Sequence, residues 1–307
     1  MLKKINIGTR GSKLALFQAN LVKDTIVEQF PDYSVEIKIY KTQGDKILDV
    51  ALSKIGDKGL FTKELELALL SKEIDIAVHS LKDLPTTLPY GLTLAAVLPR
   101  AEFRDVIISL NNTTTNTFTS STRVATSSLR RQAGVLSICS GIILLDIRGN
   151  VETRIKKMSD GYCDALIMAA AGVQRLGLDS YISQIIDPEI ITPAVSQGII
   201  GIEARENDSE FQEIFTAINH KSTHMMAVAE RDFLRSLEGG CQVPIGAYSN
   251  ISKETFTLHG FVASVDGKKT LRSKMTLPLN DFKKIGTLLA DEMKTSGARD
   301  ILNSICR

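Results

Sequence analysis

The first third of the chain alternates short apolar runs with longer stretches in which apolar residues recur every three or four positions. The runs Ile5–Gly8, Val35–Tyr40 and Asp75–Val78 are typical of strands, whereas Lys13–Phe30 and Lys63–Ser71 have the periodicity of amphipathic helices. Strands that alternate with helices are typical of a parallel, doubly wound sheet with helices on both faces. The N-terminal part is therefore predicted to be an α/β lobe.

A second set of alternating elements follows Arg104. The expected strands are Val124–Thr126, Ile142–Ile147 and Asp164–Ala170, and the expected helices are Leu129–Ser137 and Val151–Ser159. These elements predict a second α/β lobe. The later segment Gln197–Glu203 again has a strand-like pattern, and we expect it to return to the first sheet.

The C-terminal part of the sequence has a different pattern. The helix-like stretches Thr223–Leu237 and Asp281–Thr295 enclose two strand-like stretches, Thr255–Val265 and Lys268–Leu277, which are joined at Asp266-Gly267. The fold class predicted for the chain is α/β, with two α/β lobes and a small C-terminal α+β domain. We expect the first lobe to span 1–99 with 195–217, the second 105–193, and the C-terminal domain 222–307.

Composition and charge limit the possible functions. The chain has 307 residues, of which 43% are hydrophobic, and its 37 Lys and Arg nearly balance its 35 Asp and Glu. A nucleic-acid-binding protein normally carries a marked basic excess, so we expect no nucleic-acid partner. Neither a signal-peptide pattern nor an apolar run long enough for a membrane span is present, which predicts a cytoplasmic protein without a membrane partner. The four Cys are far apart without metal-ligand spacing, so we expect reduced thiols and no metal site.

Basic and hydroxyl side chains follow several predicted strands, where helices begin. They are Arg10, Ser12, Ser128, Arg130, Arg131, Arg148 and Arg154. Helix N-termini favour anions, and guanidinium groups hold carboxylate or phosphate through paired hydrogen bonds. These corners therefore predict an anion-binding site, although a single such corner is also typical of a solvated Arg beside a helix cap. The sequence around Arg10 is weakly echoed at Ala125–Ser128, which hints at two related lobes.

Lys82-Asp83 follows a predicted buried strand and precedes Leu84-Pro85, which fixes a corner at the strand end. A carboxylate beside a Lys and near several Arg should stay ionised at neutral pH, and it could stabilise a developing cation or transfer protons. A structural ion pair is the alternative interpretation for Asp83. His79 could act as a base, but a lone His after a strand is more often a packed residue.

Cys241 follows Gly239-Gly240, which allow close backbone approach to an exposed sulfur. This thiol is a candidate nucleophile or covalent attachment point, although an unpaired Cys more often packs as a small apolar residue. The charged stretch Gly44–Gly59 is long enough to be a mobile lid, and an ordinary exposed loop is the alternative.

Six motifs in order along the chain resemble the porphobilinogen deaminase (hydroxymethylbilane synthase) family. They are Gly8–Leu16 (GTRGSKLAL), Lys58–Glu66 (KGLFTKELE), Asp75–Pro85 (DIAVHSLKDLP), Thr126–Gln132 (TSSLRRQ), Arg148–Arg154 (RGNVETR) and Leu237–Gly246 (LEGGCQVPIG). The resemblance covers nearly the whole chain. It implies two lobes similar to those of periplasmic binding proteins, followed by a third domain that carries Cys241.

The resemblance also implies an activity. The enzyme would join four porphobilinogen molecules head to tail with loss of ammonia and release hydroxymethylbilane by hydrolysis, in tetrapyrrole and heme biosynthesis. A dipyrromethane cofactor would be held by a thioether at Cys241, and Asp83 would assist loss of the amino group and stabilise the azafulvene-like cation. The positions that match the family's carboxylate-binding set are Arg10, Ser12, Lys82, Thr126, Ser128, Arg130, Arg131, Arg148, Arg154 and Arg175. Lys54, Lys58 and Phe61 match the lid and its edge.

A few further expectations remain. Ser196 stands where many members of the family have Gly, at an expected crossing between lobes. We expect a monomer whose partner is the small-molecule substrate. A two-lobed solute receptor is a competing interpretation, but it would have no need of the Gly239-Gly240-Cys241 sequence. A phosphate-handling enzyme would need a glycine-rich phosphate-binding motif, which is missing from the sequence.

Overall fold

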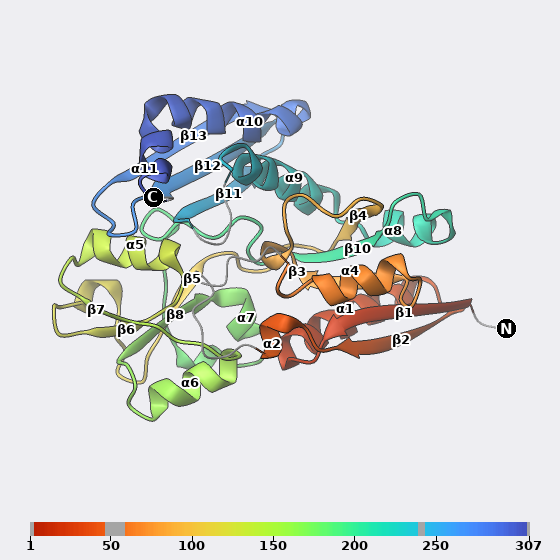
Figure 1. The fold of residues 1–307 in the computed structure, drawn as a ribbon, viewed down its shortest axis with the longest axis horizontal. Coiled ribbons are helices and arrows are strands. Elements are labelled where there is room, and N and C mark those ends of the chain that lie inside the picture. Colours follow the sequence, from red (N-terminus) through yellow and green to blue (C-terminus); the bar gives the residue numbers. More distant parts are fainter. Residues whose placement is uncertain (1–2, 47–58, 239–242, 306–307) are drawn as a thin grey trace. The chain divides into compact units, whose positions relative to one another are not determined.

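The computed structural model describes residues 3–46, 59–238 and 243–305 (Figure 1). The chain forms two compact units. Among the described residues, the first unit consists of residues 3–46, 59–101 and 198–224, and the second of residues 102–197, 225–238 and 243–305.

The first unit contains a mixed sheet flanked by helices. Its strands are β1 (Lys3–Arg10), β2 (Tyr33–Tyr40), β3 (Ile76–Ser80), β4 (Leu92–Val97) and β10 (Ile200–Arg205), and its helices are α1 (Lys13–Gln29), α2 (Gln43–Lys46), α4 (Lys63–Leu70) and α8 (Gln212–Ile218). The order is β2-β1-β3-β10-β4, with β10 antiparallel to both of its neighbours. The return of Gln197–Glu203 to the first sheet is confirmed, but the prediction of a purely parallel sheet is wrong at β10.

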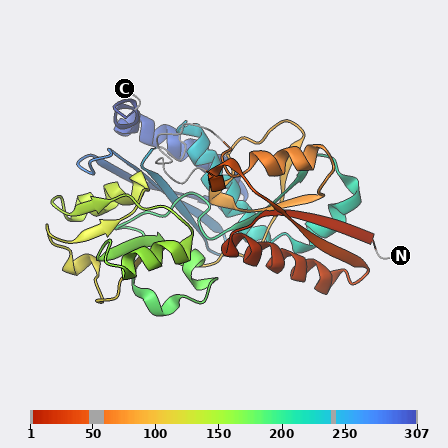
Figure 2. The same ribbon diagram turned by 60° about the horizontal axis from the view of Figure 1, so that its bottom comes forward.

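Apolar residues of this sheet alternate between two buried layers. Ile5 and Ile7 of β1 pack with Val22 and Ile26 of α1 and with Phe215 of α8. On the other face, α4 packs against β3 through a separate cluster that includes Leu65 and Leu69. Figure 2 shows dark-red α1 and orange α4 on opposite sides of the red strands. The predicted two-sided covering of the sheet is confirmed.

The second unit begins with another mixed sheet. Its strands are β5 (Asp105–Ile108), β6 (Arg123–Ala125), β7 (Ile143–Leu145), β8 (Ala165–Ala169) and β9 (Ile182–Ile185), and its helices are α5 (Leu129–Ile138), α6 (Val151–Ser159) and α7 (Ala170–Gln174). The order is β7-β6-β8-β5-β9, with β5 antiparallel to its neighbours. This is the arrangement of the first sheet again, so the two lobes share a topology, as the short sequence echo suggested.

The second unit also contains the C-terminal part of the chain. An antiparallel sheet in the order β11-β12-β13 is formed by Ile245–Ile251, Thr255–Ala263 and Thr270–Pro278, and it packs against α9 (Lys221–Ser236), α10 (Phe282–Met293) and α11 (Arg299–Asn303). The turn between β12 and β13 lies at the predicted Asp266-Gly267, where Gly267 has a φ of 69°. The predicted fold class, two α/β lobes and a small C-terminal α+β part, is confirmed. The division into three domains with the stated boundaries stays a prediction.

Candidate anion-binding and catalytic site

In the first unit, three segments meet around a small cavity of about 70 Å³. They are the end of β1, the short 3-10 helix after β3, and the turn before α4. The residues that line this cavity include Arg10, Ser12, Gln18, Phe61, Thr62, His79, Ser80 and Asp83. Strand ends and a helix start therefore bring together four of the predicted site residues, Arg10, Ser12, Phe61 and Asp83.

Asp83 closes the 3-10 helix Leu81–Asp83, which follows β3 directly. Leu81 is buried and anchors this turn, while Asp83 is exposed and lines the cavity. The neighbouring Lys82 is half-buried. Leu84, held extended before Pro85, ends the turn, as the sequence predicted. The structure thus presents the Asp83 carboxylate to an external molecule.

Arg10 contacts two neighbours that fix its guanidinium. It forms an ion pair with Asp45 of α2 and lies over the ring of Phe61, with 4.2 Å from its Cζ to the ring centroid. Burial favours neutral Asp45, but hydrogen bonds from Arg10 and Thr42 outweigh it and lower the pKa of this carboxyl. A Cβ at Gly44 would lie 2.1 Å from Phe61 Cε1, so glycine is needed for the ring to pack there. The ion pair with Asp45 and the Phe61 ring therefore hold Arg10 at the cavity.

Two further polar residues that line this cavity have structural partners. Ser12 caps α1, because its Oγ accepts a hydrogen bond from the Ala15 N–H at 3.2 Å. His79 is buried, and its Nε2 lies 3.0 Å from Oε2 of Glu203 on β10. The sequence-based preference for a packed His79 is therefore confirmed.

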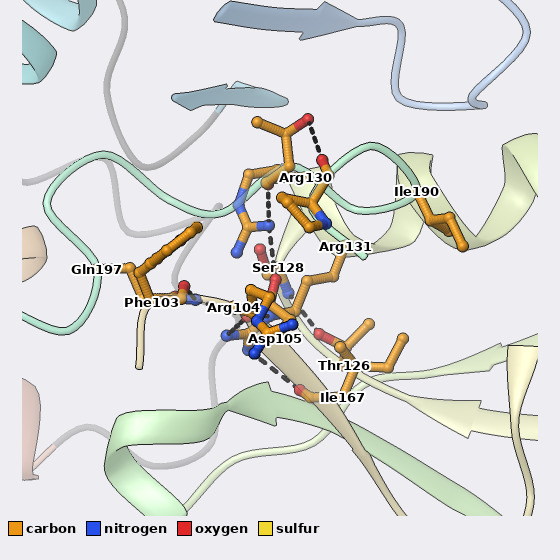
Figure 3. Close-up of polar contacts among 12 residues, drawn as sticks. Phe103, Arg104, Asp105, Thr126, Ser128, Arg130, Arg131, Ile167, Ile190 and Gln197 are labelled. Atoms are coloured by element: carbon orange, nitrogen blue, oxygen red, sulfur yellow. Dashed lines mark hydrogen bonds and ion pairs between the residues drawn. The ribbon is translucent and has the colours of Figure 1, made fainter. Parts of the chain in front are cut away.

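In the second unit, the first turn of α5 carries the candidate carboxylate-binding pair Arg130 and Arg131. Both side chains are buried, at 5% and 7% exposure, against the fully buried Asp105 at the start of β5. Asp105 accepts hydrogen bonds from Arg130 Nη1 at 2.7 Å and from Arg131 Nη2 at 2.8 Å (Figure 3). The Gln197 amide donates to the same carboxylate at 2.9 Å. One carboxylate thus holds two guanidinium groups side by side.

Burial alone would raise the pKa of Asp105, but the charges of Arg130 and Arg131 outweigh it and hold the pKa far below the ordinary carboxyl value. The three groups together therefore carry one net positive charge. Arg130 Nη1 also donates to the Thr192 carbonyl at 2.5 Å, and Arg131 Nη1 donates to the Ile167 carbonyl at 3.1 Å. Among the described residues, Arg130 makes these two hydrogen bonds through Nη1, which leaves its Nε and Nη2 donors for an anion.

Thr126 and Ser128 lie beside the arginine pair. Thr126 is buried, and its Oγ1 accepts a hydrogen bond from the Ser128 N–H at 3.3 Å. Ser128 occupies the N-cap position of α5 without a side-chain cap bond, which matches the predicted helix start. The loop between β6 and α5 thus corresponds to the β1–α1 corner that holds Arg10 and Ser12.

The remaining predicted arginines follow other strands of the second unit. Arg154, on α6, donates through Nε to the Gly149 carbonyl at 2.7 Å, and Arg148 is half-buried before the Asn150 cap. Arg175 ends α7, and burial lowers the pKa of its guanidinium to about 10, so it stays charged at neutral pH. All three arginines remain candidates for binding a carboxylate.

Three predicted site residues, Cys241, Lys54 and Lys58, lie outside the described residues. Cys163 is buried, and burial raises the pKa of its thiol to about 11, which suits a core residue and not a nucleophile. Within the described part of the chain, no helix combines the length and apolar character that crossing a lipid bilayer requires.

Sequence reasoning missed Asp105 and Gln197, which organise the arginine pair. Asp105 is 25 positions from Arg130, so no local sequence pattern connects the two residues. One signal was present: an acidic residue that begins an otherwise apolar run, Asp105-Val106-Ile107-Ile108, must have a buried partner if the run is a core strand.

Comparisons with known proteins agree with this geometry. The family model "Porphobilinogen deaminase, dipyromethane cofactor binding domain" matches residues 5–213, and "Porphobilinogen deaminase, C-terminal domain" matches residues 225–295. Porphobilinogen deaminase of Chlorobaculum tepidum is 46% identical over 308 residues, covering 99% of each chain. That of a Nostoc species is 46% identical over 306 residues, covering 99% of this chain and 95% of the relative.

Solved structures are similar at lower identity. A probable amino-acid transporter extracellular-binding protein of Bacillus subtilis has a TM-score of 0.42 at 14% identity, with 71% of this chain and 90% of that chain covered. An effector-binding domain solved with benzoate has a TM-score of 0.43 at 14% identity, with 70% and 90% covered.

The fold, the cavity around Arg10 and the Arg130–Arg131 pair define an α/β enzyme with cationic sites at its strand ends. The exposed carboxylate of Asp83 lines the cavity that contains Arg10. The chain belongs to the porphobilinogen deaminase family, enzymes of tetrapyrrole biosynthesis whose larger part is a dipyrromethane cofactor binding domain. The resemblance inferred from the six motifs is confirmed.

Proposed function

We propose that this chain is the transferase that joins four porphobilinogen molecules head to tail, releases one ammonia from each, and frees hydroxymethylbilane by hydrolysis. Its membership of the family supports this activity. The observation that carries the residue assignment is the cavity of the first unit, where the exposed carboxylate of Asp83 lines the same space as Arg10 and Ser12.

Asp83 has the chemistry that this reaction requires. Loss of ammonia from the aminomethyl group of porphobilinogen leaves an azafulvene-like cation, and a nearby carboxylate stabilises the developing positive charge. The amino group must leave protonated, and the pyrrole carbon that forms the new bond must afterwards lose its proton. A carboxyl group can supply the first proton and accept the second. Arg10, fixed by Asp45 and Phe61, is assigned to a substrate or cofactor carboxylate.

The arginine pair of the second unit fits a polycarboxylate cofactor. Each pyrrole of dipyrromethane carries an acetate and a propionate, and Arg130 has Nε and Nη2 donors beyond those that Asp105 and Thr192 occupy. The net positive charge of the pair favours such a group. We assign Arg130, Arg131, Thr126, Ser128, Arg148, Arg154 and Arg175 to carboxylate binding, together with Ser12 and Lys82 of the first unit. When bound, dipyrromethane supplies the pyrrole carbon to which the first substrate is joined.

Cys241 is the proposed attachment point of the cofactor, through a thioether, because Gly239 and Gly240 precede it in the matching motif. Lys54 and Lys58 are proposed to belong to a lid whose edge is Phe61. We further propose that the enzyme acts as a monomer in the cytoplasm, with porphobilinogen as its partner.

The experiment is a product balance. Purified protein is incubated with porphobilinogen, and ammonia and hydroxymethylbilane are quantified over the same interval. The proposal predicts four ammonia for each bilane, with both products abolished in Asp83→Asn. Porphobilinogen that stays unconsumed, or ammonia released without a bilane, contradicts it.

A further inference from the structure

Thr192 connects the arginine pair to the C-terminal sheet. It is 2% exposed, and its backbone carbonyl accepts the hydrogen bond from Arg130 Nη1 at 2.5 Å. Its hydroxyl donates to the Pro188 carbonyl at 3.0 Å and accepts a hydrogen bond from Arg272 Nη1. A single buried residue therefore contacts a proposed carboxylate-binding arginine on one side and an arginine of β13 on the other.

Arg272 is held in one orientation by three contacts. Besides the bond to Thr192, its Nη2 donates to the Ile190 carbonyl at 3.1 Å. Its guanidinium also lies over the ring of Phe261, 4.4 Å from the centroid, and Phe261 is its register partner on β12. Phe261 is buried against Ala133 of α5, the helix that carries Arg130. Arg272 thus braces the 190–192 segment from the C-terminal sheet.

The same segment is also fixed by β11. The Ala247 N–H donates to the Pro193 carbonyl at 3.0 Å. A Cβ at Gly246 would lie 2.7 Å from the Pro193 carbonyl oxygen and 2.8 Å from that of Thr192, so the two backbones pack directly against each other. Contacts with the C-terminal sheet therefore help to fix the position of the Thr192 carbonyl, which accepts the hydrogen bond from Arg130 Nη1.

We propose that Arg272 is a positioning residue for carboxylate binding by Arg130, acting through Thr192. The inference rests on the proposed function, which assigns Arg130 to a cofactor or substrate carboxylate. With Nη1 held by both Asp105 and Thr192, the guanidinium of Arg130 has a fixed plane, and its Nε and Nη2 donors point in a set direction. Without the contacts of Arg272, Thr192 can shift, and Arg130 takes a wider range of orientations. A bidentate hydrogen bond from Arg130 to a carboxylate is then weaker.

The test uses Arg272→Gln and Thr192→Val, which remove the same hydrogen bond from its two ends, and their double variant. The matched control is Lys274→Gln, which removes a charge on the same face of the same strand. Two quantities are measured on each full-length protein. One is the porphobilinogen concentration that gives half-maximal cofactor loading of apo-protein, read by intact mass, and the other is the separate change in KM and kcat.

We expect Arg272→Gln and Thr192→Val each to raise the half-loading concentration and KM by about two- to tenfold, the range that one net hydrogen bond supports, with kcat nearly unchanged. The double variant should be less affected than the sum of the two single variants, because both remove the hydrogen bond between Arg272 and Thr192, while the contacts of Thr192 with Pro188 and of Arg272 with Ile190 and Phe261 are lost in one variant each. Lys274→Gln should match the parent chain. A general loss of structure would instead lower kcat and the thermal midpoint together.

Arg130→Leu separates the two levels of the proposal. If Arg130→Leu raises the half-loading concentration while Arg272→Gln and Thr192→Val leave it unchanged, the positioning role is refuted and the proposed function stands. If Arg130→Leu itself loads normally, the carboxylate-binding role of Arg130 fails, and the role of Arg272 fails with it. Additive effects in the double variant would also overturn the proposal.

Discussion

Replacing Asp105 by Asn should destabilise the second unit strongly. The carboxylate is fully buried and accepts hydrogen bonds from Arg130, Arg131 and Gln197, so its charge balances one of two buried guanidinium groups. Asn keeps the size but removes the charge and places an amide donor against other donors. Breaking a buried ion pair from one side costs about 3–5 kcal/mol, a large part of the roughly 5–15 kcal/mol of a typical domain.

The measurement is urea unfolding followed by circular dichroism, with the midpoint and slope fitted for each variant. Asp160→Asn is the control, because Asp160 forms an exposed pair with Lys156, and such a pair is worth under about 1 kcal/mol. A loss below about 1 kcal/mol for Asp105→Asn would refute the argument that Asp105 holds the arginine pair together.

The change in unfolding free energy at acid pH is a second test of the role of Asp105. The folded-state pKa of Asp105 lies far below its value in the unfolded chain, so the unfolded state takes up the proton first as pH falls. Its stabilising contribution is therefore complete above the ordinary carboxyl pKa of about 4 and is lost progressively below it. The difference in unfolding free energy between the parent chain and Asp105→Asn should shrink below about pH 4. A difference that stays constant down to pH 2 contradicts this sign.

Three further outcomes are expected. Asp83→Asn should keep the cofactor mass but lower kcat by at least about a hundredfold, as expected for a lost general acid–base group, in a porphobilinogen consumption assay; near-normal turnover removes Asp83 from its role. Ser196→Gly should raise the unfolding free energy by about 1 kcal/mol, because Ser196 has a φ of 61° and a buried hydroxyl without a hydrogen-bond partner among the described residues. A lower urea midpoint for this variant would argue against backbone strain at Ser196. Gly246→Ala should cost about 1–3 kcal/mol, since its Cβ would meet two backbone carbonyls, and an unchanged midpoint would show that the segment yields easily.

The local sequence pattern was enough to predict most helices and strands, and also the two strand-to-helix loops that hold candidate site residues. Helix α6 begins after Asn150, whose side chain accepts from the Thr153 N–H, and ends at Ser159, as its periodicity and cap indicated. The strand-like pattern of Gln197–Glu203 predicted a strand that returns to the first sheet, and β10 lies there. Its antiparallel direction was not predicted, because a strand that returns from another lobe carries no local signal of its direction.

The site was predictable where chemistry follows directly after a strand, and not where it depends on distant pairs. Arg10, Ser12 and Asp83 lie at strand ends, and the structure places all three around one cavity. The motif around Arg130 predicted an anion-binding group, but burial against Asp105 arises from the packing of α5 on β5 and β8, across more than 20 positions. Motif and spacing therefore located the arginine pair, whereas only tertiary structure shows what holds it.

The positive φ of Ser196 illustrates the same limit. The resemblance indicated that glycine is common at this position, yet the sequence alone did not show the backbone conformation. The structure gives the reason, since a φ of 61° lies in the region that favours glycine. The Ser196 N–H donates to the buried Glu230 carboxylate at 2.8 Å, which helps to hold this conformation.

The most direct test of the central claim, a covalently primed transferase, is the intact mass of the purified chain. The account predicts an excess equal to one dipyrromethane over the mass of the 307-residue sequence, and no excess in Cys241→Ser. Fully active protein at the unmodified mass, or the same excess in Cys241→Ser, would contradict it.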